Sequence, residues 1–239
     1  MSHSLIAKLV TLFLLNPLWI NDALSKNLDK SLFSNKLEEI LNEKKDDLLK
    51  DLFLKESLTQ FNKDNKSFRK KYKDMKWSIT TIKNYPNELF LDIKIKSKRE
   101  LGNQTYDLDT NQTVKVEFHK NKIKEYEVID EESILTSLNS PLIIKKVIPS
   151  KVLTGERYEI NLIIESPLDK SLIASGMTIL NKYEKIKISN KNFGLKPNQT
   201  GGLFKYIQAP LEPGYQTISA VITHPKGIYS ITKKIKVGL

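Results

Sequence analysis

Histidine and carboxylate side chains are the groups here that could bind a metal ion or do acid–base chemistry, because the chain contains no cysteine. Beyond the N-terminal segment the histidines are His119 and His224, and neither has a second histidine near it in the sequence. Zinc sites built on histidine bring two or three ligands together. We therefore expect no metal site, no histidine-based catalysis and no thiol chemistry.

A short acidic motif, Asp107, Asp109 and Asn111, resembles the opening of a calcium-binding loop. Such a loop needs glycine at its sixth position and a bidentate glutamate at its twelfth. The sequence has Gln112 and Phe118 at these two positions. We expect a polar turn here and no calcium ion.

The densest acidic cluster could do acid–base work if one carboxyl group were buried and its pKa raised. Its first members alternate with lysine along an expected strand, Ile123 to Ile129. The later ones begin an expected helix over 131–138, where the helix dipole favours negative charge and Asp130 can cap the first turn. We expect structural roles, no catalytic residue, no cofactor and no enzymatic activity. The cluster consists of Glu125, Glu127, Asp130, Glu131 and Glu132.

The densest basic segment runs from Phe68 to Lys76. We expect a short helix that starts near Asp64 and Asn65, with Phe68, Tyr72 and Met75 on one face and lysines on the other. Such a helix suits an acidic partner or lipid headgroups. A solvated lysine face is the alternative.

The formal net charge of +11 favours anionic partners such as a membrane surface or an acidic protein. Arginine, the side chain best suited to bidentate phosphate contacts, occurs only as Arg69, Arg99 and Arg157. We therefore expect no nucleic-acid partner. The charge also has a compositional explanation, because a chain rich in Lys, Asn and Ile is typical of an AT-rich genome.

The N-terminus carries an apolar segment, Leu9–Ile20, that is too short to span a bilayer. Small residues follow at Ala23 and Ser25, the positions that a signal peptidase reads. We expect a signal peptide over residues 1–25 with cleavage between Ser25 and Lys26; the alternative is an uncleaved anchor. The protein would then be exported, to the periplasm or, in a photosynthetic bacterium, the thylakoid lumen.

The elements that must position any site fall into two modules, joined by a linker at 139–141. Residues 26–138 predict an α+β module, in which helices over 28–75, bent at Lys44–Lys45, pack on an antiparallel β-meander. Tyr106 and Leu108 lie in a less regular stretch of that meander. Residues 142–239 predict an all-β sandwich of about seven short strands, one of them with Ile186 and Ile188.

Each module resembles a known architecture. Helices followed by a curved meander resemble the nuclear transport factor 2-like modules, which often enclose an apolar pocket. This resemblance implies six candidate lining residues, for which ordinary core packing is the alternative: Tyr72, Trp77, Phe90, Tyr106, Phe118 and Tyr126.

In the second module, Leu211–Gly214 leads into an alternating strand, and a turn at His224–Gly227 leads into a closing strand that ends at Val237. This pattern resembles the last strands of immunoglobulin-like and fibronectin-type domains, without the cysteine pair of antibodies. The whole chain is similar to uncharacterised exported two-domain proteins of photosynthetic bacteria.

Three functions remain open. The first is a non-enzymatic interaction or scaffold protein, whose partner is another protein or an anionic membrane surface. The second is a carrier that holds a small apolar ligand in the N-terminal module. The third is an enzyme that uses the same pocket. An enclosed cavity, and a carboxylate pointing into it, would distinguish them.

Overall fold

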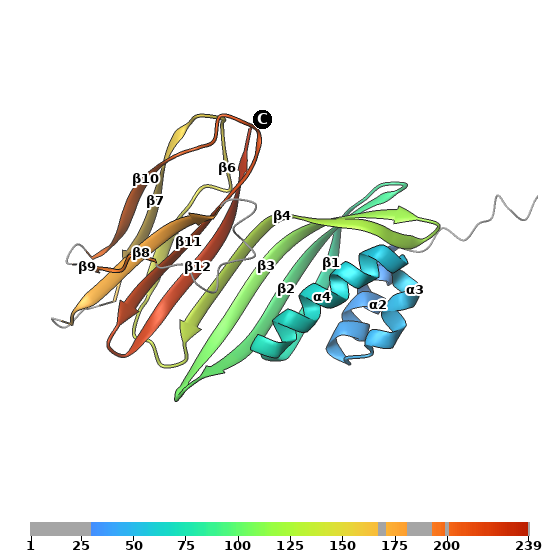
Figure 1. The fold of residues 1–239 in the computed structure, drawn as a ribbon, viewed down its shortest axis with the longest axis horizontal. Coiled ribbons are helices and arrows are strands. Elements are labelled where there is room, and N and C mark those ends of the chain that lie inside the picture. Colours follow the sequence, from blue (N-terminus) through green and yellow to red (C-terminus); the bar gives the residue numbers. More distant parts are fainter. Residues whose placement is uncertain (1–29, 167–170, 181–192, 199–200, 239) are drawn as a thin grey trace, which may run out of the picture.

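The computed structural model describes residues 30–166, 171–180, 193–198 and 201–238. Three N-terminal α-helices are followed by mostly antiparallel strands in two sheets, so the chain is α+β (Figure 1). The predicted signal peptide, its cleavage site at Ser25 and Lys26, and the strand expected around Ile186 lie outside the described residues. No helix in the described part has the length and apolar character needed to cross a bilayer.

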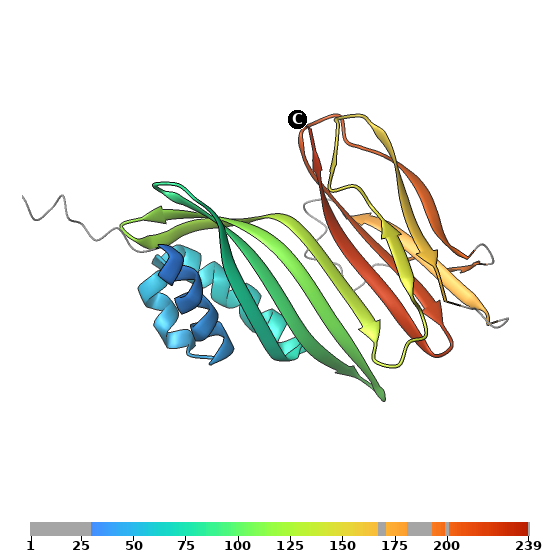
Figure 2. The same cartoon turned by 180° about the vertical axis from the view of Figure 1, so that it is seen from behind.

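The helices lie together on one face of the first strands, as Figures 1 and 2 show from both sides. The bend predicted at Lys44–Lys45 is confirmed, because Lys44 has φ of 56° and ends the first helical run. The helix expected to start near Asp64 is wrong: it starts nine residues earlier, at Lys55, and ends before Tyr72. The helices are α2 (Lys30–Asn42), the 3-10 turn η1 (Asp46–Leu48), α3 (Leu49–Leu52) and α4 (Lys55–Lys71).

Four long strands form the predicted antiparallel meander. Their alternation places every second side chain toward the helices, and these side chains, with those of α2 and α3, form one hydrophobic core. The turn between the last two strands is tight, with φ of 49° at Lys120 and 62° at Asn121. The strands are β1 (Lys73–Asn84), β2 (Glu88–Leu101), β3 (Gln104–His119) and β4 (Lys122–Ser137).

Two expectations for this meander are wrong. The segment with Tyr106 and Leu108 is regular β3, and so are Asp107 and Asp109, which therefore form no polar turn. The helix expected over 131–138 is the second half of β4. There Asp130 pairs with Thr113 while Val128 pairs with the next residue, Val114, so Ile129 is an extra residue. Immediately before this β-bulge the side chains that point inward have even residue numbers, and after it they have odd ones. The period of two is therefore interrupted, and the resulting spacing of side chains resembles that of a helix.

The C-terminal half is all β in its described residues, as expected from Leu142 onward. Its strands contribute to both sheets. The strands are β5 (Ile144–Val147), β6 (Lys151–Val152), β7 (Arg157–Ile164), β8 (Ile173–Leu180), β9 (Lys196–Asn198), β10 (Gly202–Gln208), β11 (Gly214–His224) and β12 (Gly227–Val237).

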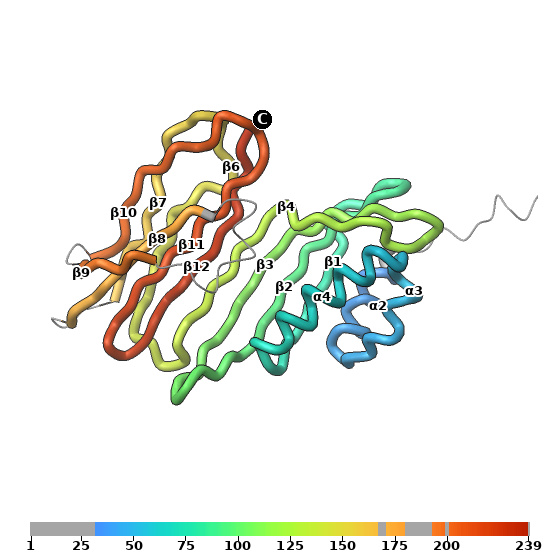
Figure 3. Tube along the Cα trace, viewed as in Figure 1, coloured from blue at the N-terminus to red at the C-terminus, as the bar shows by residue number. Residues whose placement is uncertain are grey.

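The larger sheet has nine strands and runs through both predicted modules (Figure 3). Its order is β1-β2-β3-β4-β12-β11-β8-β9, with β6 paired to β12, and a three-stranded sheet β10-β7-β5 faces its C-terminal part. The junction is β4 with β12, which pair from Tyr229–Thr136 to Lys234–Glu131. The expected self-contained sandwich is thus not confirmed, because the larger sheet combines N-terminal and C-terminal strands. The boundary at 139–141 stays a prediction.

Candidate functional site

A cavity of about 360 Å³ lies between helix α4 and the inward face of β1–β4. Aromatic and aliphatic side chains make up most of its wall, with a smaller set of polar groups. The lining residues are Phe61, Asp64, Asn65, Phe68, Tyr72, Trp77, Ile95, Leu108, Thr110, Gln112, Tyr126, Val128, Glu131 and Ser133.

Helix α4 supplies one wall through a single face. Phe61, Asp64, Asn65 and Phe68 are spaced at three and four residues, so they lie on the same side of the helix. Arg69 fixes this wall to the rest of the helical layer. Its Nε donates to the Oδ1 of Asn65 at 3.2 Å, its Nη2 donates to the backbone oxygen of Leu41 at 3.1 Å, and it forms an ion pair with Asp46.

The strands supply the opposite wall, and Trp77 on β1 is held in place through its backbone. The side chain of Asn42, at the end of α2, accepts from the Trp77 N–H at 2.8 Å and donates to the Trp77 carbonyl at 2.9 Å. This double contact leaves the indole ring free to face the cavity.

The bulge at Ile129 decides which acidic residue of β4 enters the cavity. Tyr126 and Val128 line it before the bulge, and Glu131 and Ser133 line it after the bulge. Without the extra residue the alternation would have brought Asp130 inward instead. Glu131 accepts the last of two linked hydrogen bonds. The Thr110 hydroxyl donates to the Ser133 hydroxyl at 3.0 Å, and the Ser133 hydroxyl donates to the Glu131 carboxylate at 3.4 Å.

Two hydrogen-bond donors of the lining have no partner. The indole Nε1 of Trp77 and the hydroxyl of Tyr126 are both buried, and neither has an acceptor in hydrogen-bond geometry within the described structure, although the Tyr126 hydroxyl lies close enough to the Asp64 carboxylate to interact with it. Burial, and secondly the nearby carboxylate of Asp64, raise the pKa of Tyr126 to about 12, so its hydroxyl keeps its proton. An unpaired buried donor costs about 1–3 kcal/mol. A ligand or solvent molecule with an acceptor atom would remove this cost.

The six residues expected to line a pocket divide into two sets. The structure brings Tyr72, Trp77 and Tyr126 together in the cavity. Phe90 lies on the other face of β2 against Tyr85, with ring centroids 6.0 Å apart. The other two point inward but outside the cavity. Tyr106 is buried and donates to Gln104 at 2.7 Å, while Phe118 packs edge-on against Phe33 at 5.1 Å.

The polar half of the lining is not predicted from the sequence. Asp64 and Asn65, the expected helix start, lie within α4, and Glu131, expected in the first turn of a helix, lies in β4. The spacing of Phe61, Asp64 and Phe68 along a helical face could have found the α4 wall. The Glu131 position could not be found in the same way, because it depends on the bulge.

The remaining candidate groups do not form a second site in the described residues. No three histidine or carboxylate side chains come together there in a way that could hold a metal ion. His119 is exposed at the end of β3, and the Nδ1 of His224 accepts from the backbone N–H of Lys226 at 3.1 Å.

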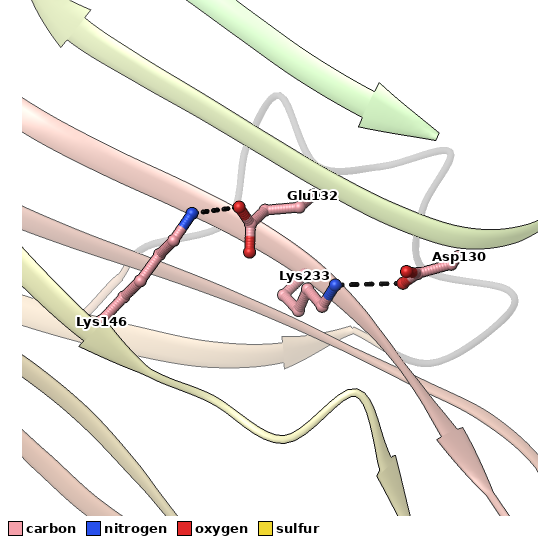
Figure 4. A network of polar contacts seen from close by, with 4 residues as sticks. All are labelled: Asp130, Glu132, Lys146 and Lys233. Atoms are coloured by element: carbon pink, nitrogen blue, oxygen red, sulfur yellow. Dashed lines mark hydrogen bonds and ion pairs between the residues drawn. The ribbon is translucent and has the colours of Figure 1, made fainter. Parts of the chain in front are cut away.

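A charged cluster marks the junction between β4 and the C-terminal strands (Figure 4). Asp130 and Glu132 project from β4 on the face away from the cavity. The ammonium of Lys233 lies 3.1 Å from Asp130, and Lys146 of β5 is ion-paired to Glu132. Because Lys146 belongs to the smaller sheet, these contacts connect both sheets to the strand that carries Glu131.

The C-terminal half matches a known family. Residues 139–238 are similar to the family described as Domain of unknown function (DUF8623). The match begins at Asn139, the first residue of the predicted linker, and does not include the cavity. No curated protein matches the chain.

Proposed function

We propose that this protein is a carrier that binds a small, mainly apolar ligand in the cavity under α4. The observation that carries the proposal is the pair of unpartnered donors, Trp77 Nε1 and the Tyr126 hydroxyl, in the wall of a largely apolar cavity. Binding pockets combine such a wall with a few polar groups that orient the ligand. The ligand would carry an acceptor atom for at least one of these donors.

The volume supports a small ligand. The cavity of about 360 Å³ lies at the lower end of the range of about 300–1,000 Å³ that is typical of ligand pockets. At ~30 Å³ for each water it corresponds to about twelve waters. Releasing water from aromatic walls favours an apolar occupant.

Native mass spectrometry of the purified protein, before and after extraction with organic solvent, tests the proposal. A mass difference is expected that extraction removes and that reconstitution with the extract restores. It should be absent from Trp77→Ala and from Val128→Trp, which fills the cavity, and present in Leu211→Ala, a substitution of an exposed residue on the far side of the molecule. Unchanged ligand retention in Val128→Trp would contradict the proposal.

A scaffold role, as an interaction protein, is the second candidate. It is supported by large exposed apolar side chains in the C-terminal half, among them Leu172, Tyr206 and Leu211. The partner would be another protein or an anionic membrane surface, and no nucleic acid. A pull-down of the protein from its native envelope, compared with the triple alanine variant of these residues, tests this role.

An enzyme that uses the cavity is the third candidate, because Asp64 and Glu131 both line it. Turnover in a hydrolase screen that is lost in Glu131→Gln would favour it over a carrier.

Three further proposals are supported by the sequence alone. They are export to a periplasm or thylakoid lumen, a nuclear transport factor 2-like N-terminal module, and an immunoglobulin-like arrangement within the C-terminal strands.

A further inference from the structure

The charge of the cavity wall is opposite to that of the chain. Basic residues outnumber acidic ones by 39 to 28 in the sequence. Among the fourteen described lining residues, however, none is lysine, arginine or histidine, and two are acidic, Asp64 and Glu131. A wall drawn at random from this composition would carry more positive than negative charge.

The two arginines beside the wall already have partners. Arg69 is directed toward Asp46 and the Leu41 carbonyl in the helical layer, and its Nε donates to the side chain of Asn65. The guanidinium of Arg99 lies 5.7 Å from the centre of the Tyr72 ring, outside the lining.

A third cation, Lys234 of β12, pairs with Glu131 in the strand register, but its ammonium donates to the backbone oxygen of Val128 and lies 3.8 Å from the centre of the Tyr215 ring. Among the described residues, no ion pair joins any of these cations to Asp64 or Glu131.

The rest of the wall is rich in aromatic rings. Phe61, Phe68, Tyr72, Trp77 and Tyr126 surround the space, with Phe61 and Tyr126 packed edge to face at 6.1 Å. Aromatic faces attract cations, and tryptophan and tyrosine do so most strongly. An anion would instead meet two carboxylates and no cation, so its desolvation would not be repaid.

We infer that the ligand is a small organic amine, cationic at neutral pH, with an apolar body that fills the aromatic part of the cavity. This inference rests on the proposed carrier function and specifies its ligand class. Glu131 holds the ammonium from the sheet side, and Asp64, which is exposed, does so from the open side of α4. Trp77 and Tyr126 donate to an acceptor atom on the body.

Three probes that share a methoxyphenethyl body separate charge from shape. The amine, the alcohol and the carboxylate, which is methoxyphenylpropanoate, all offer the same ether oxygen to Trp77 or Tyr126. Calorimetric titration of the full chain is expected to show the amine binding at least about tenfold more tightly than the alcohol, as a desolvated cation–π and carboxylate contact allows, and the carboxylate most weakly.

Substitutions that remove a negative charge test which carboxylates cause the preference for the amine. Glu131→Gln and Asp64→Asn are each expected to reduce the advantage of the amine while leaving the affinity for the alcohol unchanged. Glu125→Gln removes one negative charge from an exposed position of the same strand and should have no effect. Circular dichroism of each variant checks that the fold is retained.

The outcomes distinguish the two claims. Equal affinities for amine and alcohol, or a preference that survives in both Glu131→Gln and Asp64→Asn, would overturn the amine inference and leave the carrier function standing. If no probe binds, or if Val128→Trp binds all three as well as the parent protein does, both the inference and the carrier function fall.

Discussion

Two tyrosines of the same chain place their hydroxyl groups in opposite situations. The buried hydroxyl of Tyr126 has no partner, whereas that of Tyr158 donates to the Oε1 of Gln216 at 2.6 Å. Removing an unsatisfied group is near neutral or stabilising, while removing one partner of a buried pair leaves the other unsatisfied.

The matched substitutions are therefore expected to differ. Tyr126→Phe should leave the free energy of unfolding unchanged or raise it by up to about 1 kcal/mol, and Tyr158→Phe should lower it by about 1–3 kcal/mol. Urea unfolding, followed by circular dichroism, measures both. A loss in Tyr126→Phe as large as that in Tyr158→Phe would show that the Tyr126 hydroxyl has a partner after all.

Alkaline pH tests the same side chains. Burial raises the pKa of Tyr126, Tyr158 and Tyr229 from 10.0 to about 12. Below pH 10 the folded and unfolded states both hold these protons, so the tyrosines leave stability unchanged. As the pH rises from 10 toward 12, the unfolded state loses the protons first, and the folded state loses stability.

We expect a free energy of unfolding whose tyrosine-dependent part is flat below pH 10 and falls above it. The triple Tyr→Phe variant, titrated in parallel, separates this part from the lysines that titrate in the same range. Absorbance of tyrosinate in the folded protein should show the delayed ionisation directly. Ionisation of all three at their ordinary pKa would contradict the burial that the structure gives them.

At the scale of elements, the bulge in β4 is the feature that connects sequence, site and junction. Ile129 has no pairing partner on β3, and the residues before and after it keep their register. Deleting Ile129 thus leaves Val128 opposite Val114 and Asp130 opposite Thr113, with every side chain on its present face. Deleting Ile134 instead turns the last residues of β4 to the wrong face.

These two deletions are expected to have very different results, although each removes one isoleucine from the same strand. The Ile129 deletion should fold with a modest loss of melting temperature, and the Ile134 deletion should lose the cooperative transition. Thermal melts recorded by circular dichroism provide the comparison. Equal damage from both would mean that the bulge itself is needed to shape the sheet.

The bulge also explains where sequence reasoning succeeded and where it failed. Period-two alternation identified Ile79 on β1 and Leu89 through Ile95 on β2, and the break at Lys44 was found from the interrupted helical stripe. In β4 the inward positions change from Tyr126 and Val128 to Glu131 and Ser133. A local pattern has no means of distinguishing this change from a helical period, because the bulge is defined by pairing with β3.

The candidate site was predictable to the same extent. The resemblance to nuclear transport factor 2-like modules implied that Tyr72, Trp77 and Tyr126 line a pocket, and these three rings do line the cavity. Phe118 was implied by the same resemblance and packs on Phe33. Whether a helix covers the ring depends on where α4 crosses the sheet, which is a tertiary property that no local pattern records.

At the scale of the molecule, the junction contains a buried cation. Lys233 shares its face of β12 with Ile231 and Ile235, and its side chain is 8% exposed against 46% for its partner Asp130. Burying an ion pair costs desolvation energy that the pair only partly repays. Replacing Lys233, the buried cation, should therefore change the free energy of unfolding differently from replacing Asp130, its counterion.

We expect Lys233→Met to be neutral or stabilising, by up to about 2 kcal/mol, and Asp130→Asn to be destabilising by about 1–3 kcal/mol, because the ammonium then stays buried without a carboxylate. Chemical denaturation of both variants tests this asymmetry. A loss in Lys233→Met that exceeds the loss in Asp130→Asn would show that the ion pair itself holds the junction together.

Continuity of the nine-stranded sheet implies that the two halves unfold together. Ile231 is fully buried on β12, pairs with Ile134 of β4, and packs in the C-terminal core. Ile231→Ala is expected to cost about 2–5 kcal/mol. If β4 and β12 form one cooperative unit, the loss must also appear in a signal from the other half of the molecule. Trp77 provides that signal, once Trp19 has been replaced by Phe so that one indole remains.

In that background, Ile231→Ala should move the urea midpoint of Trp77 fluorescence and the midpoint of circular dichroism by the same amount. Leu91→Ala, in the N-terminal core, is the reciprocal variant and should behave alike. Two independently folding modules divided at 139–141 would give a different result: Ile231→Ala would leave the Trp77 transition where it was. The measurement therefore decides whether the cavity wall is stabilised by strands of residues 139–238, the part of the chain that is similar to the DUF8623 family.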